Sequence, residues 1–197
     1  MATKQSVAGE GRATYLAPMR RITLLLLLAS PLAILLFGWP AAAQPAPTPR
    51  KLGQFQAWTA ATHIEAGQKI CYAFAYASRA EGVPNRPLTQ VLLTVTHRSQ
   101  GRDAVVLRSG YSYQRGAEVK LLVGPTEFNF FTNGTDAHGR DNTGTVRAFR
   151  AGREVLARGP GPNNRGAAND LFSLAGFAQA HEAISQECPA TAAPVRR

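Results

Sequence analysis

The sequence predicts a mainly β fold, a single β-sandwich-like domain of antiparallel strands that ends in a helix. Short segments rich in β-branched and aromatic residues recur about every ten residues with glycines between them, which is typical of sandwiches and related all-β folds. The last long segment instead has apolar residues at helical spacing. The two cysteines, Cys71 and Cys188, lie toward opposite ends of the part of the chain that would form this domain, as expected if one disulfide closes it.

Residues 1–43 are expected to be a cleaved signal peptide. Two arginines at 20–21 precede an apolar run over 22–37, and small residues follow at 41–43. A charged segment, an apolar core and small residues in this order are the layout of a secretory signal. The alternative is an uncleaved membrane anchor, which the marginal length of the run and Pro31 within it disfavour. We therefore expect no stable membrane span after processing.

The remaining sequence divides into a linker, one domain and a tail. Residues 44–52 begin with QPAPTP and are expected to be an extended, disordered, proline-rich linker. Residues 53–188 are long enough to bury one hydrophobic core. Residues 189–197 are expected to be a disordered tail. Translation starts at Met1 or at Met19, and the second would give a leader of more ordinary length.

Seven segments have the aromatic or β-branched content of strands, and they are 55–61, 69–77, 90–97, 103–109, 117–123, 127–132 and 154–158. The third and fourth are predicted to form one hairpin, and the fifth and sixth another. Alternation in the second puts Ile70, Tyr72, Phe74 and Tyr76 on one face and Cys71, Ala73 and Ala75 on the other. The segments 133–144 and 159–168 are predicted to be loops.

Two helices are predicted. A short helix near 145–151 is expected to be capped from within 141–143 and to end at Gly152. A C-terminal helix near 174–187 is expected to follow a turn, with Ser173 as its N-cap. Its apolar face, which should dock on the domain, consists of Phe177, Ala180, Ile184 and Cys188.

Cys71 and Cys188 are predicted to form a disulfide, because an exported domain with two cysteines most simply pairs them. The bond would tie the C-terminal helix to an early strand. On a chain-entropy argument it would contribute about 4–5 kcal/mol at most. The alternative is two buried free thiols, which an oxidising compartment disfavours.

The chain is basic, with 22 lysines and arginines against 12 acidic residues and a net charge of +10. Arginines recur in one region, and Arg147, Arg150, Arg153 and Arg158 are candidate contacts to a polyanion such as lipopolysaccharide or a heparin-like glycan. The alternative, an ordinary solvated surface, is favoured because these arginines alternate with alanine and glycine. We expect no nucleic-acid partner, since the leader removes the protein from that compartment.

The strongest candidate for catalysis is the loop cluster Asp136, His138 and Asp141, which could serve a small periplasmic hydrolase. A hydrogen-bonded polar turn explains the same residues better. The other histidines, His63, His97 and His181, are expected to be structural or exposed. We expect no cofactor and no metal site, because no CxxC or HxxxH spacing is present.

Several short motifs together resemble the invasion-associated locus B family of exported proteins, found mostly in alphaproteobacteria. They are FQAW (55–58), Cys71, GYSY (110–113), FNFF (128–131) and DLFSLAGF (170–177) followed by Ala180 and Cys188. The motif residues expected to have structural roles are Trp58, Gly110, Tyr111, Asp170, Ser173, Leu174, Gly176 and Phe177. Two departures are the absence of a cysteine in 59–70 and the presence of His138 where an aromatic residue often stands.

The resemblance implies a periplasmic or envelope-associated protein with a sandwich-like fold and without catalytic residues. In a few pathogenic members it also implies a link to host-cell entry. We therefore expect a non-enzymatic binding protein whose partner is an envelope protein, a glycan or a lipid. A surface-exposed host-interaction factor that binds anionic cell surfaces is the alternative, with the hydrolase as a second alternative. The sequence does not indicate the oligomeric state.

Overall fold

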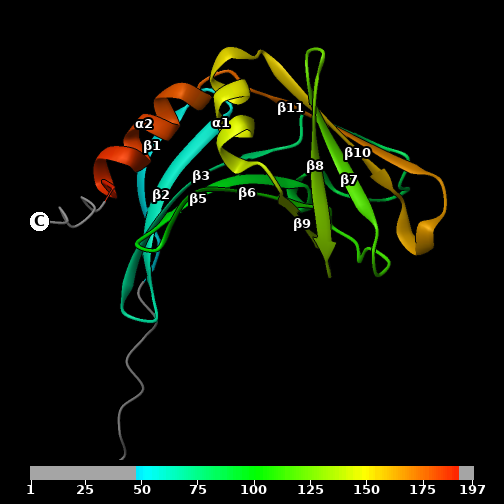
Figure 1. The fold of residues 1–197 in the computed structure, drawn as a ribbon, viewed down its shortest axis with the longest axis horizontal. Coiled ribbons are helices and arrows are strands. Elements are labelled where there is room, and N and C mark those ends of the chain that lie inside the picture. The colour runs from blue at the N-terminus through cyan, green and yellow to red at the C-terminus, as the bar shows by residue number, and fades with distance from the viewer. Residues whose placement is uncertain (1–47, 191–197) are drawn as a thin grey trace, which may run out of the picture. The chain divides into compact units, whose positions relative to one another are not determined.

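A computed structural model describes residues 48–190, which form one antiparallel sheet with two helices packed on it (Figure 1). The mainly β prediction is confirmed. The predicted signal peptide, residues 44–47 of the predicted linker and residues 191–197 of the predicted tail lie outside the described residues. No helix within 48–190 is both long enough and apolar enough to cross a bilayer.

The strands follow one another along the chain mostly as hairpins. They are β1 (Arg50–Phe55), β2 (Trp58–Glu65), β3 (Gln68–Tyr76), β4 (Arg79–Glu81), β5 (Leu92–Arg98), β6 (Gly101–Arg108), β7 (Glu118–Val123), β8 (Thr126–Asn133), β9 (Asp136–Gly139), β10 (Glu154–Pro160) and β11 (Ala167–Ser173). The helices are α1 (Asn142–Ala151) and α2 (Phe177–Glu187), and single 3₁₀ turns lie at Leu88–Gln90 and Pro162–Asn164. The order across the sheet is β1-β2-β3-β5-β6-β9-β8-β7-β10-β11-β4.

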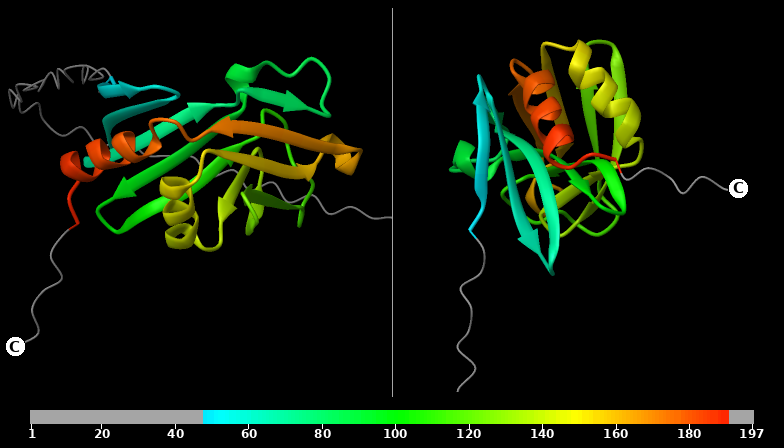
Figure 2. Two further views of the ribbon diagram at one scale, coloured as in Figure 1. Left: turned by 90° about the horizontal axis from the view of Figure 1, so that it is seen from above. Right: turned by 90° about the vertical axis from the view of Figure 1, so that its left-hand side faces the viewer.

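The two layers expected of a sandwich are here two halves of one continuous sheet. Strand β9 joins them, because it pairs with β6 on one side and with β8 on the other. The half containing β7, β8 and β10 crosses the half containing β3, β5 and β6 at a steep angle (Figures 1 and 2). The far edge of the sheet lies next to the end of β3, because the N–H of Ser78, between β3 and β4, donates to the Leu171 carbonyl of β11 at 2.8 Å. Both halves therefore enclose one core.

The first predicted strand and the linker need correction. Residues 50–52, predicted to be disordered linker, belong to β1, and Arg50 pairs with Thr62 of β2. The predicted strand 55–61 is divided by a tight turn in which Gln56 has a φ of 50°. Pairing with β2 supplies β1 with backbone hydrogen bonds that its polar composition did not indicate.

The polar segment 133–144 is not entirely loop, because it contains β9. The cap of the following helix is as predicted: the Asp141 carboxylate accepts from the Gly144 N–H at 2.8 Å. The helix begins at Asn142, three residues before the predicted start, and Gly152 ends it as expected.

The C-terminal prediction is wrong in its first part. Residues 167–173 form β11 and not a loop and turn, and Ser173 ends that strand instead of capping a helix. The N-cap of α2 is Gly176, which has a φ of 87° and lies against the Phe55 carbonyl where no Cβ fits. The alternate residues of β11 that face inward are Ala168, Asp170 and Phe172, a period of two that the Asn and Asp content obscured.

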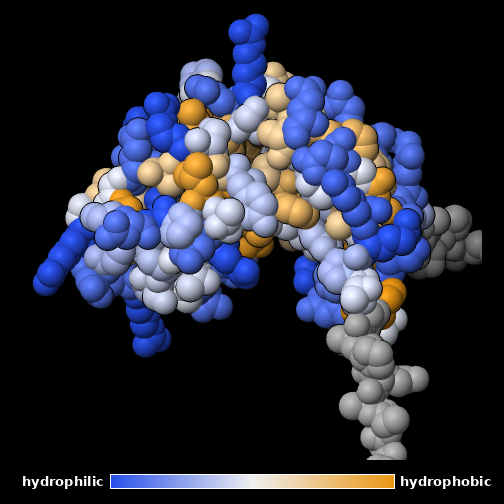
Figure 3. Space-filling model, turned by 180° about the vertical axis from the view of Figure 1, so that it is seen from behind, coloured by the Kyte–Doolittle hydropathy of each residue, from blue (hydrophilic) through white to orange (hydrophobic). Residues whose placement is uncertain are grey.

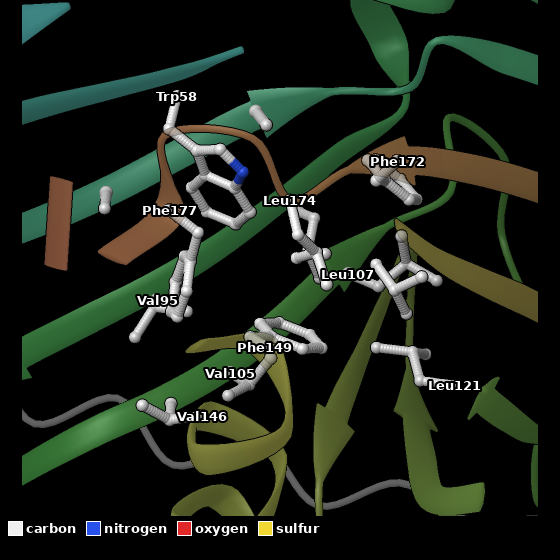
Figure 4. Packing of buried hydrophobic residues seen from close by; sticks show 14 of the residues in the cluster. Trp58, Val95, Val105, Leu107, Leu121, Val146, Phe149, Phe172, Leu174 and Phe177 are labelled. Carbon is white, nitrogen blue, oxygen red and sulfur yellow. The ribbon is translucent and has the colours of Figure 1, made fainter. Parts of the chain in front are cut away.

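The predicted docking face of α2 is confirmed. Phe177, Ala180 and Ile184 are fully buried, and the helix lies along β1, β2 and β3 (Figure 2). The Phe177 ring centroid is 4.7 Å from that of Trp58 and 5.4 Å from that of Phe149 on α1. Figure 4 shows these three side chains together in the core. The Trp58 indole donates to the Ser173 carbonyl at 2.9 Å, so its only polar atom is satisfied.

Replacing Phe177 with alanine should lower the free energy of unfolding by about 3–5 kcal/mol, because the cavity would open at the meeting point of both helices and β2. Urea-induced unfolding followed by circular dichroism measures this change. Phe131→Ala is the matched control, since Phe131 is 43% exposed and should lose far less. A loss below about 1 kcal/mol in Phe177→Ala would show that α2 is peripheral to the core.

Candidate functional site

The outer face of the sheet, the side away from the core, carries aromatic side chains in a row. On β3 the small residues Cys71, Ala73 and Ala75 point into the core. Tyr72, Phe74 and Tyr76 therefore point outward, which is the division of faces predicted from the alternation. Their ring centroids follow one another at 6.0 and 5.8 Å.

This apolar row continues across the sheet from Phe74. The register places Phe74 opposite Thr94, Thr94 opposite Val106, and Val106 opposite His138. His138 in turn lies opposite Phe131, and the two rings stack at 5.3 Å. We call Tyr72, Phe74, Tyr76, Thr94, Val106, His138 and Phe131 the outer row. Residues paired directly across a ladder share one face, so the outer row runs without a break over β3, β5, β6, β9 and β8.

Part of the outer row borders a hollow of about 420 Å³ between β2 and β6. Arginines stand at its margin: Arg98 pairs with Glu65 at 3.0 Å, and Arg108 pairs with Asp136 at 3.0 Å. Burial raises the pKa of Tyr72, so its hydroxyl keeps its proton at neutral pH and can both donate and accept. Figure 3 shows one side of the surface, on which apolar residues gather between charged ones.

The motif residues that were expected to have structural roles lie in or against the core, whereas Phe131 of the FNFF motif lies in the outer row. Trp58, Leu174 and Phe177 are buried, and Gly110 and Gly176 have left-handed backbones. The Tyr111 hydroxyl donates to the Pro160 carbonyl at 2.7 Å. The Ser173 hydroxyl accepts from the Ala175 N–H at 3.2 Å and so shapes the turn before α2. Each of these contacts holds the fold together, and none faces the outer row.

Asp170 forms a buried ion pair that the sequence did not indicate. Arg86 binds both carboxylate oxygens of Asp170, and it also donates to the Ser109 carbonyl at 2.7 Å. Only 2% of the Arg86 side chain and 4% of the Asp170 side chain are exposed. Burial raises the pKa of the Asp170 carboxyl, and the bonds from Arg86 oppose that rise. The Arg86 guanidinium also lies over the Tyr111 ring at 5.4 Å.

The four candidate polyanion contacts are all exposed. Arg147 and Arg150 lie on α1, Arg153 follows it, and Arg158 lies on β10. Among residues 48–190, none of the four has a carboxylate within ion-pair distance, in contrast to Arg98 and Arg108. Arg150 instead meets the Nδ1 atom of His181 at 3.3 Å.

The three residues of the predicted hydrolase loop make separate contacts. Asp136 binds Arg108, and Asp141 caps α1. His138 stacks on Phe131 within the outer row. The structure therefore assigns each side chain a different neighbour and brings no acid–base pair together at this loop.

A different cluster lies beneath α2, where Asp103 accepts from two histidines. His97 Nε2 is 2.9 Å and His181 Nε2 is 2.7 Å from the same carboxylate oxygen. His97 is fully buried and His181 nearly so, whereas a quarter of the Asp103 side chain is exposed. Desolvation lowers the pKa of His97, which is therefore neutral at neutral pH.

The carboxyl of Asp103 stays ionised. Burial acts to raise its pKa, but the hydrogen bonds from His181 and His97 outweigh burial and lower it overall. His97 and Asp103 are six residues apart, but His181 lies 78 residues after Asp103, so no spacing motif could have revealed all three. Only the fold brings them together.

Neither a scan against protein-family models nor a search of curated proteins found a match. A search of solved structures found similarity to the crystal structure of invasion associated protein B from Bartonella henselae, with a TM-score of 0.52 and 17% identity. The match covers 68% of this chain and 95% of that one. The chain has that protein's fold. The resemblance to the invasion-associated locus B family is thus confirmed for the fold.

Proposed function

We propose that the protein is an exported, non-enzymatic, envelope-associated protein that binds a protein partner through the outer row. The observation that carries the proposal is the outer row, a continuous and mostly aromatic row on a sheet face that neither helix covers. Tyr76 and Phe131 are 49% and 43% exposed, which is unusual for large apolar side chains grouped on one face. Interfaces between proteins are enriched in such aromatic residues at the centre and in arginine.

Several features support export. The charged, apolar and small-residue order of residues 1–43 is typical of a secretory leader. The Cys71–Cys188 disulfide is of the kind that persists in oxidising compartments. The structural neighbour is named as an invasion-associated protein, and its fold is shared.

The partner is expected to be a protein rather than a glycan or lipid. Phe74, Val106 and Phe131 offer apolar contact, and the hydroxyl groups of the outer row are limited to Tyr72, Tyr76 and Thr94. The arginines at the margin are already paired with carboxylates, so they are arranged as a polar rim and not as an open anion site. Aromatic residues at the centre of such a patch supply most of the binding energy of an interface.

Photo-crosslinking in cells tests this proposal. A photoreactive phenylalanine analogue placed at residue 74 of the full-length protein should capture a discrete protein. The same analogue at Gln179, exposed on the outer side of α2, should not. Tyr72→Ala combined with Tyr76→Ala should weaken the captured complex at least tenfold. Truncating a central aromatic residue of an interface often costs more than about 1.4 kcal/mol of binding free energy.

Three outcomes would count against the proposal. Equal crosslinking at both positions would indicate non-specific contact, and no crosslinking at residue 74 would show that the face stays free. A shifted band that resists protease would identify a glycan instead. Circular dichroism of each variant shows whether a loss of binding reflects loss of the fold.

A second function, binding to anionic cell surfaces, is favoured by one observation: the four exposed arginines have no carboxylate partner among the described residues. Retention on a heparin column should fall steeply with salt if they act together. Replacing all four with glutamine should abolish that retention. Protease treatment of intact cells, with a periplasmic marker as control, would show whether the protein faces outward at all.

A further inference from the structure

We propose that His97, Asp103 and His181 form a binding site for a divalent transition-metal cation, with Zn²⁺ as the best-fitting candidate. The three ligand atoms lie within 4.8 Å of one another, and each comes from a different element of the fold. Two imidazole nitrogens and one carboxylate oxygen are a donor set that zinc accepts readily. This site is separate from the outer row, because it lies under α2 in the interior.

The distances suit a small cation. Zinc binds imidazole nitrogen and carboxylate oxygen at about 2.0–2.1 Å, so tetrahedral ligand atoms stand about 3.3 Å apart. The two Nε2 atoms are now 2.9 and 2.7 Å from the Asp103 oxygen. Each imidazole–carboxylate pair would therefore lengthen by only about half an ångström to admit the ion. The exposed quarter of Asp103 leaves a side from which a water could complete the coordination.

The backbone holds these ligands in place. A register shift between β5 and β6 sets Arg102 and Asp103 opposite the single residue His97, the arrangement of a β-bulge. Such bulges redirect side chains, and Asp103 has a left-handed φ of 60°. His97 also pairs with Cys71 on β3, whose disulfide anchors the end of α2 and with it His181. The sheet therefore fixes the positions of His97 and Asp103, and the disulfide helps to fix that of His181 on α2.

Ion binding requires that each imidazole carry its proton on Nδ1. The Nδ1 of His97 is buried and has no hydrogen-bond partner in the described structure. No donor therefore opposes a proton there, but no acceptor stabilises it either, which reduces the affinity for the ion. At His181 the Arg150 guanidinium lies 3.3 Å from Nδ1 and must turn away. Arg150 is exposed and can do so. A neutral imidazole binds the ion through Nε2 by moving its proton from Nε2 to Nδ1, a shift that by itself releases no proton.

Two positive charges lie nearby and set a limit on affinity. Arg150 contacts His181, and Arg102 donates to the carbonyl of Cys188 beside the cluster. Both repel a cation. We therefore expect one weak but saturable site rather than a structural zinc site on which folding depends.

Isothermal titration of the untagged, oxidised full chain with Zn²⁺ tests the proposal. The expected result is one ion per chain, with affinity reduced at least tenfold in His181→Phe and in Asp103→Asn. His138→Phe is the matched control, because His138 lies on the outer face and should leave binding unchanged. Co²⁺ in place of Zn²⁺ should give the visible absorption of a tetrahedral site, which an octahedral surface ion does not show.

Either of two results would overturn the proposal. No saturable binding by the wild-type chain would show that the three side chains form only a structural hydrogen-bond network. Binding that persists in both His181→Phe and Asp103→Asn would place the ion elsewhere. Asp103→Asn keeps the shape of the side chain, and near-ultraviolet circular dichroism would show whether each variant remains folded. Neither result depends on a protein partner, so failure here would leave the proposed function standing.

Discussion

Asp170→Asn should lower the free energy of unfolding by about 3–5 kcal/mol, because it leaves the Arg86 guanidinium buried beside a neutral side chain. Only 2% of the Arg86 side chain is exposed, so water cannot replace the lost carboxylate. Its remaining bond to the Ser109 carbonyl cannot neutralise the charge. Urea-induced unfolding, followed by the fluorescence of buried Trp58, gives the change from the midpoint and slope.

The matched control is Asp136→Asn, which breaks the pair with Arg108 on the outer face. Arg108 is 57% exposed, so this loss should stay below about 1 kcal/mol. Replacing both buried partners, as Arg86→Met with Asp170→Leu, should recover most of the stability, because apolar residues of similar volume often substitute for a buried pair. Equal losses in Asp170→Asn and Asp136→Asn would contradict the burial of the Arg86 pair.

The buried pair explains why Asp170 stands in the most distinctive motif of the sequence. It faces inward on β11, between Ala168 and Phe172, at a position that an apolar residue would normally occupy. Arg86 comes from the segment between β4 and β5, 84 residues earlier. The pair therefore joins the far edge of the sheet to its middle. Pattern analysis could not find it, because nothing in the sequence around Arg86 indicates burial.

The elements that could be predicted from the sequence are those whose pattern is local. β3, the β5–β6 hairpin and the β7–β8 hairpin follow an alternation of residue types along the strand, and turn residues separate the paired strands. Each hairpin forms between segments that are adjacent in the chain. The cap at Asp141 is also local, since donor and acceptor are three residues apart. Local patterns were therefore sufficient where local hydrogen bonds coincide with a clear alternation or a capping residue.

The elements that were missed have polar sequences, and each pairs with a distant strand as well as with its neighbour in the chain. Strand β9 is only Asp136–Gly139, and it exists because β6 and β8 both donate and accept along it. Strand β11 contains Asn and Asp, which are typical of turns, but it forms a strand because it pairs with β10 and β4. Propensity is a weak guide when pairing with neighbouring strands supplies every backbone bond.

The sequence also did not show which face of β3 is buried. The larger side chains, Tyr72 and Phe74, would be expected inside. Instead Cys71, Ala73 and Ala75 face the core, and their small size lets α2 lie close against β3. The outer row follows from this choice, because the aromatic side chains are left on the far side of the sheet. The candidate binding face is thus a consequence of how closely the helix packs.

Replacing both Cys71 and Cys188 with alanine should lower the free energy of unfolding by about 4–5 kcal/mol. The bond closes a loop of 117 residues, and the two Cα atoms are 6.0 Å apart. Without it the unfolded chain gains the conformational freedom that the loop removed. Urea-induced unfolding of the oxidised wild type, the reduced wild type and the double variant measures the effect, and reductant should leave the double variant unchanged.

The same experiment shows where the disulfide acts. Phe177, Ala180 and Ile184 are fully buried, and Arg50 and Lys69 both bind Glu187 at the end of α2. These contacts should keep α2 docked in the double variant, so unfolding should remain a single transition at lower urea. Hydrogen exchange in α2 that becomes fast while the sheet stays protected would contradict this, because it would mean that the bond holds the helix in place. A loss below about 1 kcal/mol would instead show that docking alone fixes the helix and that the unfolded chain is already compact.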